Sequence, residues 1–305
     1  MQCFRHPSSD GKTALAAYRT ETEQPHALLQ ISHGMCEYFL RYEGFAEFLS
    51  QNRILVFGHD HLGHGHSVKE TSELGFTALG GGADLLIEDV HTLSMTLKHE
   101  YPNLPLILFG HSMGSFIARA VIERYPDDYN AIIICGTGGP DTPAGAGKLI
   151  ASVLMAFWGE KHRSTLLRSI AFMGYNKRFE KGCDRNAWLT RDATVVQRYN
   201  ADPLCNYVFT LRAYHDLFSL VTTVSRREWA RQIPKKLPYL VISGELDPVG
   251  SFGRGVRMVA DRMKTAGVSD LSLMLYPDMR HEILNELEHE TVWSDILEWL
   301  ELKLQ

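Results

Sequence analysis

The 305-residue chain has few cysteines, and their arrangement excludes a disulfide-rich or zinc-stabilised fold. They are odd in number and widely spaced, and no two form a C-x-x-C pair. Disulfide frameworks and structural zinc sites need tighter, paired spacings. Unpaired thiols are typical of a reducing compartment, so we expect a cytoplasmic protein. The five positions are Cys3, Cys36, Cys135, Cys183 and Cys205.

Long apolar runs and basic stripes are missing as well. The longest apolar run, residues 149–158, is far shorter than the roughly 20 residues that cross a bilayer. Residues 1–12 hold no apolar stretch that could serve as a signal sequence. The net charge is −5 without a basic stripe, which argues against a nucleic-acid partner. We therefore expect neither a transmembrane segment nor a nucleic-acid partner, and the oligomeric state stays open.

What is present is an ordinary globular composition, 45% hydrophobic and 22% charged. A chain of this length buries roughly three quarters of the surface that its unfolded form exposes, so a sizeable core needs no covalent support. At about 150 residues per domain, the length predicts two domains or one large α/β domain with an insertion.

Short apolar runs alternate along the chain with longer helical patterns, which is typical of parallel strands joined by helices. Most of the short runs are continuously apolar, as strands covered on both faces should be. Residues 83–99 and, less regularly, residues 283–304 carry apolar side chains at three- and four-residue spacing, which predicts amphipathic helices. The expected strands are residues 27–32, 53–57, 105–109, 131–135, 237–243 and 271–276.

This alternation stops between residues 138 and 234, where several helical segments follow one another without an obvious strand. We expect residues 1–137 and 235–305 to form the α/β core. Residues 138–234 should form a helical cap, or lid, over the carboxyl edge of the sheet, where ligand crevices of parallel sheets lie. A packing subdomain without a catalytic role is the alternative.

The sharpest local motif is GHSMG, residues 110–114, between an expected strand and an expected helix over residues 113–124. In that setting G-x-S-x-G predicts a nucleophile elbow, a turn so tight that its flanking positions favour glycine. The turn lifts the hydroxyl of Ser112 above the sheet edge. The side chain of His111 should point away from it, which favours a structural role.

A serine nucleophile needs a base that takes its proton and an acid that orients the base. In this kind of sheet the chain order is Ser, then Asp or Glu, then His. Asp247 follows the expected strand 237–243 and His281 follows the strand 271–276, so we predict a Ser112–Asp247–His281 triad. Glu245 is the rival acid, expected to be a solvated loop carboxylate. His289 is expected to be a surface histidine.

With these motifs in place, the chain resembles the α/β-hydrolase fold over nearly its whole length. Within it, the chain is similar to the monoacylglycerol lipase and lysophospholipase branch, which is also grouped with serine aminopeptidases. Jointly the motifs are highly specific. They are HGMCEY (33–38), RY (41–42), GHDHLGHGHS (58–67), the GHSMG elbow, GELDPV (244–249) and HEILNE (281–286).

The resemblance implies that the backbone N–H groups of Met35 and Met113 form the oxyanion hole, and that no cofactor is required. One donor following the nucleophile and one in a loop after an early strand agree with the general rule. The chain departs from the pattern in two places. Met35 and Cys36 stand where relatives often carry small residues, which would narrow the site, and Ser115 replaces a frequent glycine.

Four histidines between residues 59 and 66 raise the question of a metal site, since histidine is a common ligand. No thiolate or carboxylate cluster accompanies them beyond Asp60. The G-H-G-x-S pattern at residues 63–67 also matches a turn of similar hydrolases that hold no metal there. We therefore predict no metal at His59, His61, His64 and His66.

The apolar run 149–158 lies in the expected lid and forms two stripes at helical spacing. One stripe can pack on the core while the other binds substrate or transiently meets a lipid surface. Packing of both stripes in the core is the alternative. The first stripe is Leu149, Val153 and Phe157, and the second is Ile150, Leu154 and Trp158.

The sequence therefore predicts a serine hydrolase that cleaves esters of monoacylglycerol-like or lysophospholipid-like substrates through an acyl-enzyme. One alternative is an aminopeptidase or amidase on the same triad. It would need lid carboxylates for a substrate ammonium, and the candidates are Glu160, Glu180 and Asp184. A ligand-binding protein without catalysis is the other alternative, although such proteins commonly lose a triad member.

Overall fold

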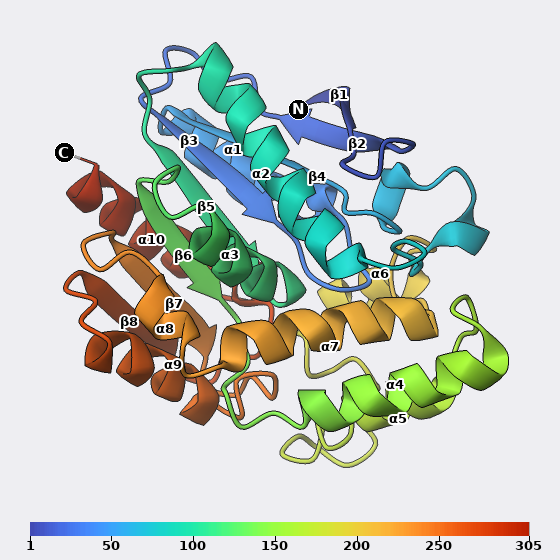
Figure 1. Cartoon of the computed structure of the whole chain (residues 1–305). Coiled ribbons are helices and arrows are strands. Elements are labelled where there is room, and N and C mark those ends of the chain that lie inside the picture. Colours follow the sequence, from blue (N-terminus) through green and yellow to red (C-terminus); the bar gives the residue numbers. More distant parts are fainter. Residues whose placement is uncertain (305) are drawn as a thin grey trace.

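The computed structural model describes residues 1–304 and contains one eight-stranded sheet in the order β1-β2-β4-β3-β5-β6-β7-β8 (Figure 1). The six strands from β4 to β8 along this order run parallel, and β1 and β2 form an antiparallel edge. The strands are β1 (Gln2–Pro7), β2 (Ala14–Arg19), β3 (Ala27–Ser32), β4 (Ile54–His59), β5 (Leu106–His111), β6 (Ala131–Cys135), β7 (Tyr239–Gly244) and β8 (Leu271–Tyr276).

Helices cover both faces of the sheet, so the central strands are buried along their whole length. Side chains such as Ile117 and Val256 pack one face, and Phe45 and Ile296 pack the other. This burial explains the continuously apolar runs. The first face carries α2 (Gly82–Glu100), α3 (Met113–Arg124) and α9 (Arg254–Thr265), and the second carries α1 (Glu43–Gln51) and α10 (His289–Lys303).

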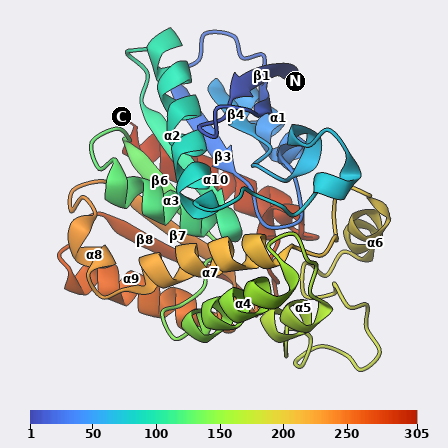
Figure 2. The same ribbon diagram turned by 45° about the vertical axis from the view of Figure 1, so that its right-hand side comes forward.

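Five helices lie between β6 and β7, and we call residues 138–234 the insertion. Its helix α7 packs on α3, and α4 packs along α7 (Figure 2). The face of α4 toward α7 consists of small residues, Ala144, Gly147 and Ala151, and a Cβ atom at Gly147 would lie 2.8 Å from the Phe218 ring. The helices are α4 (Ala144–Trp158), α5 (Thr165–Ala171), α6 (Ala193–Ala201), α7 (Leu211–Ser225) and α8 (Trp229–Gln232).

The predicted strands and the predicted α/β-hydrolase fold are confirmed, with two differences. The structure adds β1 and β2, which the apolar pattern did not indicate. The last helix was expected to begin at residue 283, but α10 begins at His289 after a short 3-10 turn, Ile283–Asn285. Glu286 separates the two because its backbone is extended and its carboxylate accepts the amides of Arg280 and Leu287.

The helices of residues 1–304 include none that is long and apolar enough to cross a membrane.

Candidate active site

Ser112 lies in the turn between β5 and α3 with a backbone φ of +54°, a conformation that costs energy for a non-glycine residue. The turn is held on both sides. The amide of Ser112 donates to the carbonyl of Cys135 on β6 at 3.0 Å. A Cβ atom at Gly110 would overlap the carbonyl of Gly114, and one at Gly114 would overlap the carbonyl of Ser32. Only glycine therefore fits two positions before and two positions after Ser112.

Asp247 and His281 follow β7 and β8, so all three predicted side chains come from the carboxyl edge of the sheet. Nδ1 of His281 lies 3.0 Å from Oδ2 of Asp247, although the ring N–H does not point along this contact as a hydrogen bond requires. Both side chains are buried. The carboxylate is oriented by the amide of Val249 at 2.8 Å and by the hydroxyl of Ser243 at 3.1 Å.

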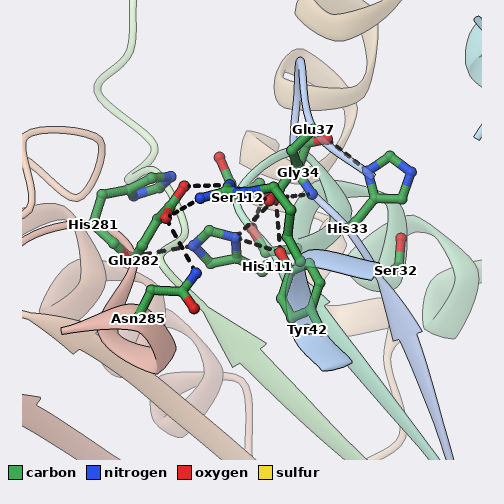
Figure 3. A network of polar contacts seen from close by, with 12 residues as sticks. Ser32, His33, Gly34, Glu37, Tyr42, His111, Ser112, His281, Glu282 and Asn285 are labelled. Atoms are coloured by element: carbon green, nitrogen blue, oxygen red, sulfur yellow. Dashed lines mark hydrogen bonds and ion pairs between the residues drawn. The ribbon is translucent and has the colours of Figure 1, made fainter. Parts of the chain in front are cut away.

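A buried carboxylate, Glu37, organises the loop beside Ser112 (Figure 3). It accepts hydrogen bonds from the Gly34 amide at 2.6 Å, the Tyr42 hydroxyl at 2.7 Å and the Arg41 guanidinium at 2.8 Å. Arg41 also forms a two-pronged ion pair with Glu282, 2.7 Å at each contact. Burial alone would raise the pKa of Glu37, but its hydrogen bonds and the nearby positive charge hold that pKa well below the usual range.

His111, the residue before Ser112, joins this network to the loop of His281 (Figure 3). Its Nε2 donates to the backbone carbonyl of His281 at 3.2 Å, and its Nδ1 lies 2.8 Å from the Tyr42 hydroxyl. The centres of the His111 and His281 rings lie 4.7 Å apart. Burial lowers the pKa of His111, but the hydrogen bond and charge of Glu37, with the charge of Glu282, raise it overall. This side chain therefore connects β5, which leads into Ser112, with the loop of His281.

The loop after β3 brings backbone amides close to Ser112. A Cβ atom at Gly34 would lie 3.2 Å from Cβ of Ser112 and only 2.5 Å from a Glu37 oxygen, so no larger residue fits there. Cys36 has a positive φ of 56°, and its thiol donates to the Tyr207 carbonyl at 3.2 Å. Met113 begins α3, so its amide is one of the helix donors without an intrahelical partner.

The histidine run does not form a ligand set. Within residues 1–304, no three His, Cys, Asp or Glu side chains are placed to share a metal ion. His33 joins the buried group by accepting the amide of His61 at 3.0 Å and contacting the Gly34 carbonyl at 2.8 Å. Burial lowers the pKa of His59 and of His64 to about 3. The neutral rings therefore pack behind the loop that carries Gly34.

The rival site residues are engaged elsewhere. Glu245 is solvent-accessible and pairs with Arg257 at 3.2 Å, and His289 starts α10, where its Nδ1 lies 2.7 Å from the Glu286 carbonyl. Of the candidate carboxylates in the insertion, Glu160 pairs with Arg212 at 2.6 Å. Asp184 accepts the amide of Asn186 and the side chain of Asn200, and Glu180 is exposed.

The stripes of α4 are mostly open to solvent, so the alternative that both stripes pack in the core is wrong. The exposed fraction is 79% for Phe157, 66% for Leu149 and 57% for Trp158. Val153 and Ile150 are also exposed, and only Leu154 is half-buried against the core. The small residues of α4 occupy the face toward α7 instead. Contact of these side chains with a substrate stays a prediction.

Sequence reasoning missed an aromatic cluster that the insertion places against His281. The Trp188 ring lies 5.0 Å from the His281 ring and packs against Phe172 and Tyr175 at 5.6 and 5.1 Å. The segment has no helical or strand periodicity, and its contacts are distant in sequence. No local signal could have identified it.

Comparisons with known proteins agree with this geometry. The family model described as "Serine aminopeptidase, S33" matches residues 23–288. The chain belongs to this family. It is 30% identical to a monoacylglycerol lipase of Mycolicibacterium smegmatis over 92% of this chain and 90% of that one. It is 28% identical to the human monoglyceride lipase over 96% of this chain and 88% of that one.

Solved structures of related proteins share the whole architecture of this family member. A thermostable carboxyl esterase from Bacillus coagulans, in complex with glycerol, superposes with a TM-score of 0.94 at 26% identity, covering 100% of this chain and 99% of that one. A lipase in an open form superposes with a TM-score of 0.89 at 27% identity, with the same coverage of both chains. The chain is thus a hydrolase of the α/β-hydrolase fold, as the sequence predicted.

Proposed function

We propose that this hydrolase cleaves carboxylic esters through an acyl-enzyme on Ser112. The observation that carries the proposal is the convergence of three predicted residues at one sheet edge. Ser112 stands on a strained elbow, and the buried His281 imidazole lies 3.0 Å from the buried Asp247 carboxylate. A nucleophile, a base and an orienting acid are the parts that acyl transfer needs.

Each residue has one role in the proposed mechanism. Ser112 Oγ attacks the ester carbonyl while His281 takes its proton, with Asp247 orienting the imidazole. The Met35 and Met113 amides stabilise the oxyanion, and each such donor is worth roughly 3–4 kcal/mol in a comparable site. His281 then protonates the departing alcohol, and water releases the acid. No step uses a metal or cofactor.

The proposed substrates are monoacylglycerol-like or lysophospholipid-like esters. The names of the relatives support this choice, because the bacterial and human proteins are lipases of monoacylglycerol. The exposed apolar side chains of α4 also support it, since an acyl chain needs apolar surface near the site. In this proposal the insertion, residues 138–234, acts as the lid. Five free thiols fit the expected cytoplasmic location.

An aminopeptidase or amidase activity is less well supported. Such an enzyme needs an unpaired carboxylate that binds the substrate's ammonium group. Glu160 is neutralised by Arg212, and Asp184 is bound by Asn186 and Asn200. The third candidate, Glu180, is exposed to solvent, where water screens its charge. Comparing hydrolysis of a p-nitrophenyl acyl ester with that of a prolyl anilide separates the two activities, and we expect the ester to be strongly preferred.

Ser112→Ala tests the proposal directly. Removing the nucleophile should lower kcat by roughly 10⁴-fold or more, because only binding and the oxyanion hole remain. The Ser112 side chain makes no capping hydrogen bond to α3, so its removal should leave the circular dichroism spectrum and the melting temperature close to those of the wild type. Ser294→Ala, at an exposed serine of α10, is the matched control and should keep its activity. Near-native turnover of monoacylglycerol by purified Ser112→Ala would refute the mechanism.

A further inference from the structure

We infer that Trp188 is a positioning residue for His281, so the insertion completes the catalytic site in addition to covering it. The inference rests on the proposed function, since it assigns a task to a neighbour of the proposed base. Trp188 belongs to residues 187–191, which we call the inner segment of the insertion. This segment lies against the loop that follows β8 and carries His281.

The backbone of the inner segment binds the backbone of the His281 loop. The amide of His281 donates to the Trp188 carbonyl at 3.3 Å, and the next amide, of Glu282, donates to the Leu189 carbonyl at 2.7 Å. The carbonyl of His281 in turn accepts from His111 at 3.2 Å. Both backbone polar groups of the base are thus bound, one by the insertion and one by the residue before the nucleophile.

Side-chain contacts strengthen the same junction. The Arg280 guanidinium donates to the carbonyl of Ala187 at 2.5 Å and to that of Thr190 at 3.3 Å. Its centre also lies 4.1 Å above the ring of Phe179, a cation–π arrangement. Arg280, the residue before His281, therefore holds the inner segment against the His281 loop through its side chain.

The indole of Trp188 packs on the imidazole itself. The ring centres are 5.0 Å apart at an angle of 40°, and only 8% of Trp188 is exposed. The same aromatic cluster includes Tyr175 and contacts Val249, whose amide donates to Asp247. The indole thus limits rotation of the imidazole and helps to keep water from its contact with Asp247.

Catalytic groups must be held within a fraction of an ångström by the residues that pack on them. A displacement of about 1 Å can cost on the order of 100-fold in rate. A residue that positions the base acts in the same way on every substrate, whatever the length of its acyl chain. Loss of Trp188 should therefore lower kcat for every ester, including acetate, with little change in KM.

The test compares Trp188→Phe, Trp188→Leu and Trp188→Met. Trp299→Leu is the matched control, because Trp299 is a similarly buried tryptophan on α10 whose indole donates to Ser272 in β8, away from the site. We expect Trp188→Leu and Trp188→Met to lose roughly 10- to 100-fold in kcat on p-nitrophenyl acetate, with KM within about threefold. Trp188→Phe keeps a flat ring on the imidazole and should recover most of kcat. The proton NMR signals of the His281 imidazole should shift or broaden in the Leu and Met variants only.

Wild-type kcat on acetate and an unchanged proton resonance in a folded Leu or Met variant would overturn the inference. So would a loss confined to KM or equal losses in the Phe, Leu and Met variants. Because Met fills irregular space, it provides a folded variant should Leu fail. Activity of Ser112→Ala would instead refute the proposed function, so the two failures are distinguishable.

Discussion

The insertion contains two apolar regions that behave in opposite ways. Helix α4 has the longest apolar run of the chain, yet Phe157 and Leu149 are 79% and 66% exposed. The inner segment has no such run, yet Trp188 and Leu189 are buried against the loop of the proposed base. Apolar content in the sequence therefore does not identify which part of an insertion contacts a catalytic site.

The difference has a packing cause. Helix α4 approaches α7 through Ala144, Gly147 and Ala151, and this close contact turns its larger side chains outward. The inner segment contributes backbone carbonyls, which can pair with another loop whatever the side chains are. Backbone pairing between distant loops leaves almost no trace in sequence patterns.

The largest effect on stability that separates the two regions should come from Arg280→Met. Arg280 joins the inner segment to the His281 loop through two carbonyls and the Phe179 ring. We expect a loss of about 1–3 kcal/mol in the free energy of unfolding. We also expect roughly tenfold lower kcat on both short and long esters. Urea titration and steady-state kinetics measure the two effects.

Arg178→Met is the matched control for this prediction. Arg178 also lies over an aromatic ring, 4.0 Å from the centre of Phe252, but it is exposed and does not bind the inner segment. Arg178→Met should lower the free energy of unfolding by no more than about 1 kcal/mol, and it should leave kcat unchanged. Equal losses of stability and kcat in both arginine variants would contradict the claim that the inner segment supports the His281 loop.

Most of the parallel sheet could be predicted because each strand is covered on both faces and reads as one apolar run. Strands β1 and β2 could not, since β1 is largely exposed and polar and β2 is rich in alanine, which has a low β propensity. The positions of Ser112, Asp247 and His281 followed from motif and chain order. The contacts of Trp188 with His281 did not, because they join residues 93 positions apart.

Substitutions on α4 should affect acyl-chain selectivity without affecting the base. Phe157→Ser should leave the free energy of unfolding within about 0.5 kcal/mol, because the side chain is 79% exposed. Turnover of medium- and long-chain monoacylglycerols should fall about tenfold, since each methylene removed from water is worth about 0.8 kcal/mol. Acetate esters should be unaffected. A chain-length series of esters measures this.

Leu154→Ser provides a comparison for Phe157→Ser on the same helix, because Leu154 is half-buried against the core. It should lower the melting temperature, unlike Phe157→Ser, at a cost of about 1–2 kcal/mol. Equal losses on all chain lengths in Phe157→Ser would show that α4 does not meet the acyl chain.

A second contact joins the insertion to the core, and its contribution to the free energy of unfolding should depend on pH. Asp216 on α7 accepts the Thr77 hydroxyl at 2.5 Å, and burial raises its pKa to about 6. The folded state thus holds this proton more tightly than the unfolded state, so its contribution to stability falls as pH rises from about 4 through 6. Between pH 5 and 7 the loss is about 1 kcal/mol.

Asp216→Asn should remove that part of the pH dependence. Denaturant unfolding at pH 5 and pH 7 provides the measurement. Asp89 on α2 is the matched residue in the core, with its pKa raised by burial to about 6 as well. Asp89→Asn should have a similar effect on the pH dependence. An unchanged slope in Asp216→Asn would mean that Asp216 ionises normally in the folded protein.

The smallest expected effect is that of a chelator. The proposed mechanism uses no metal, and the buried His59 and His64 are neutral rings that pack behind the Gly34 loop. Dialysis against EDTA should leave the hydrolysis rate unchanged. Loss of activity with recovery on adding zinc would reopen a metal site in the histidine run.

The most direct test of the account is the site and rate of labelling by a fluorophosphonate probe, followed by peptide mass spectrometry. We predict a single adduct on Ser112, formed at the wild-type rate in Phe157→Ser and roughly 10- to 100-fold more slowly in Trp188→Leu. An adduct on another serine would contradict the assigned nucleophile. Equal rates in the two variants would contradict the division of the insertion into a region that positions the base and a region that meets the acyl chain.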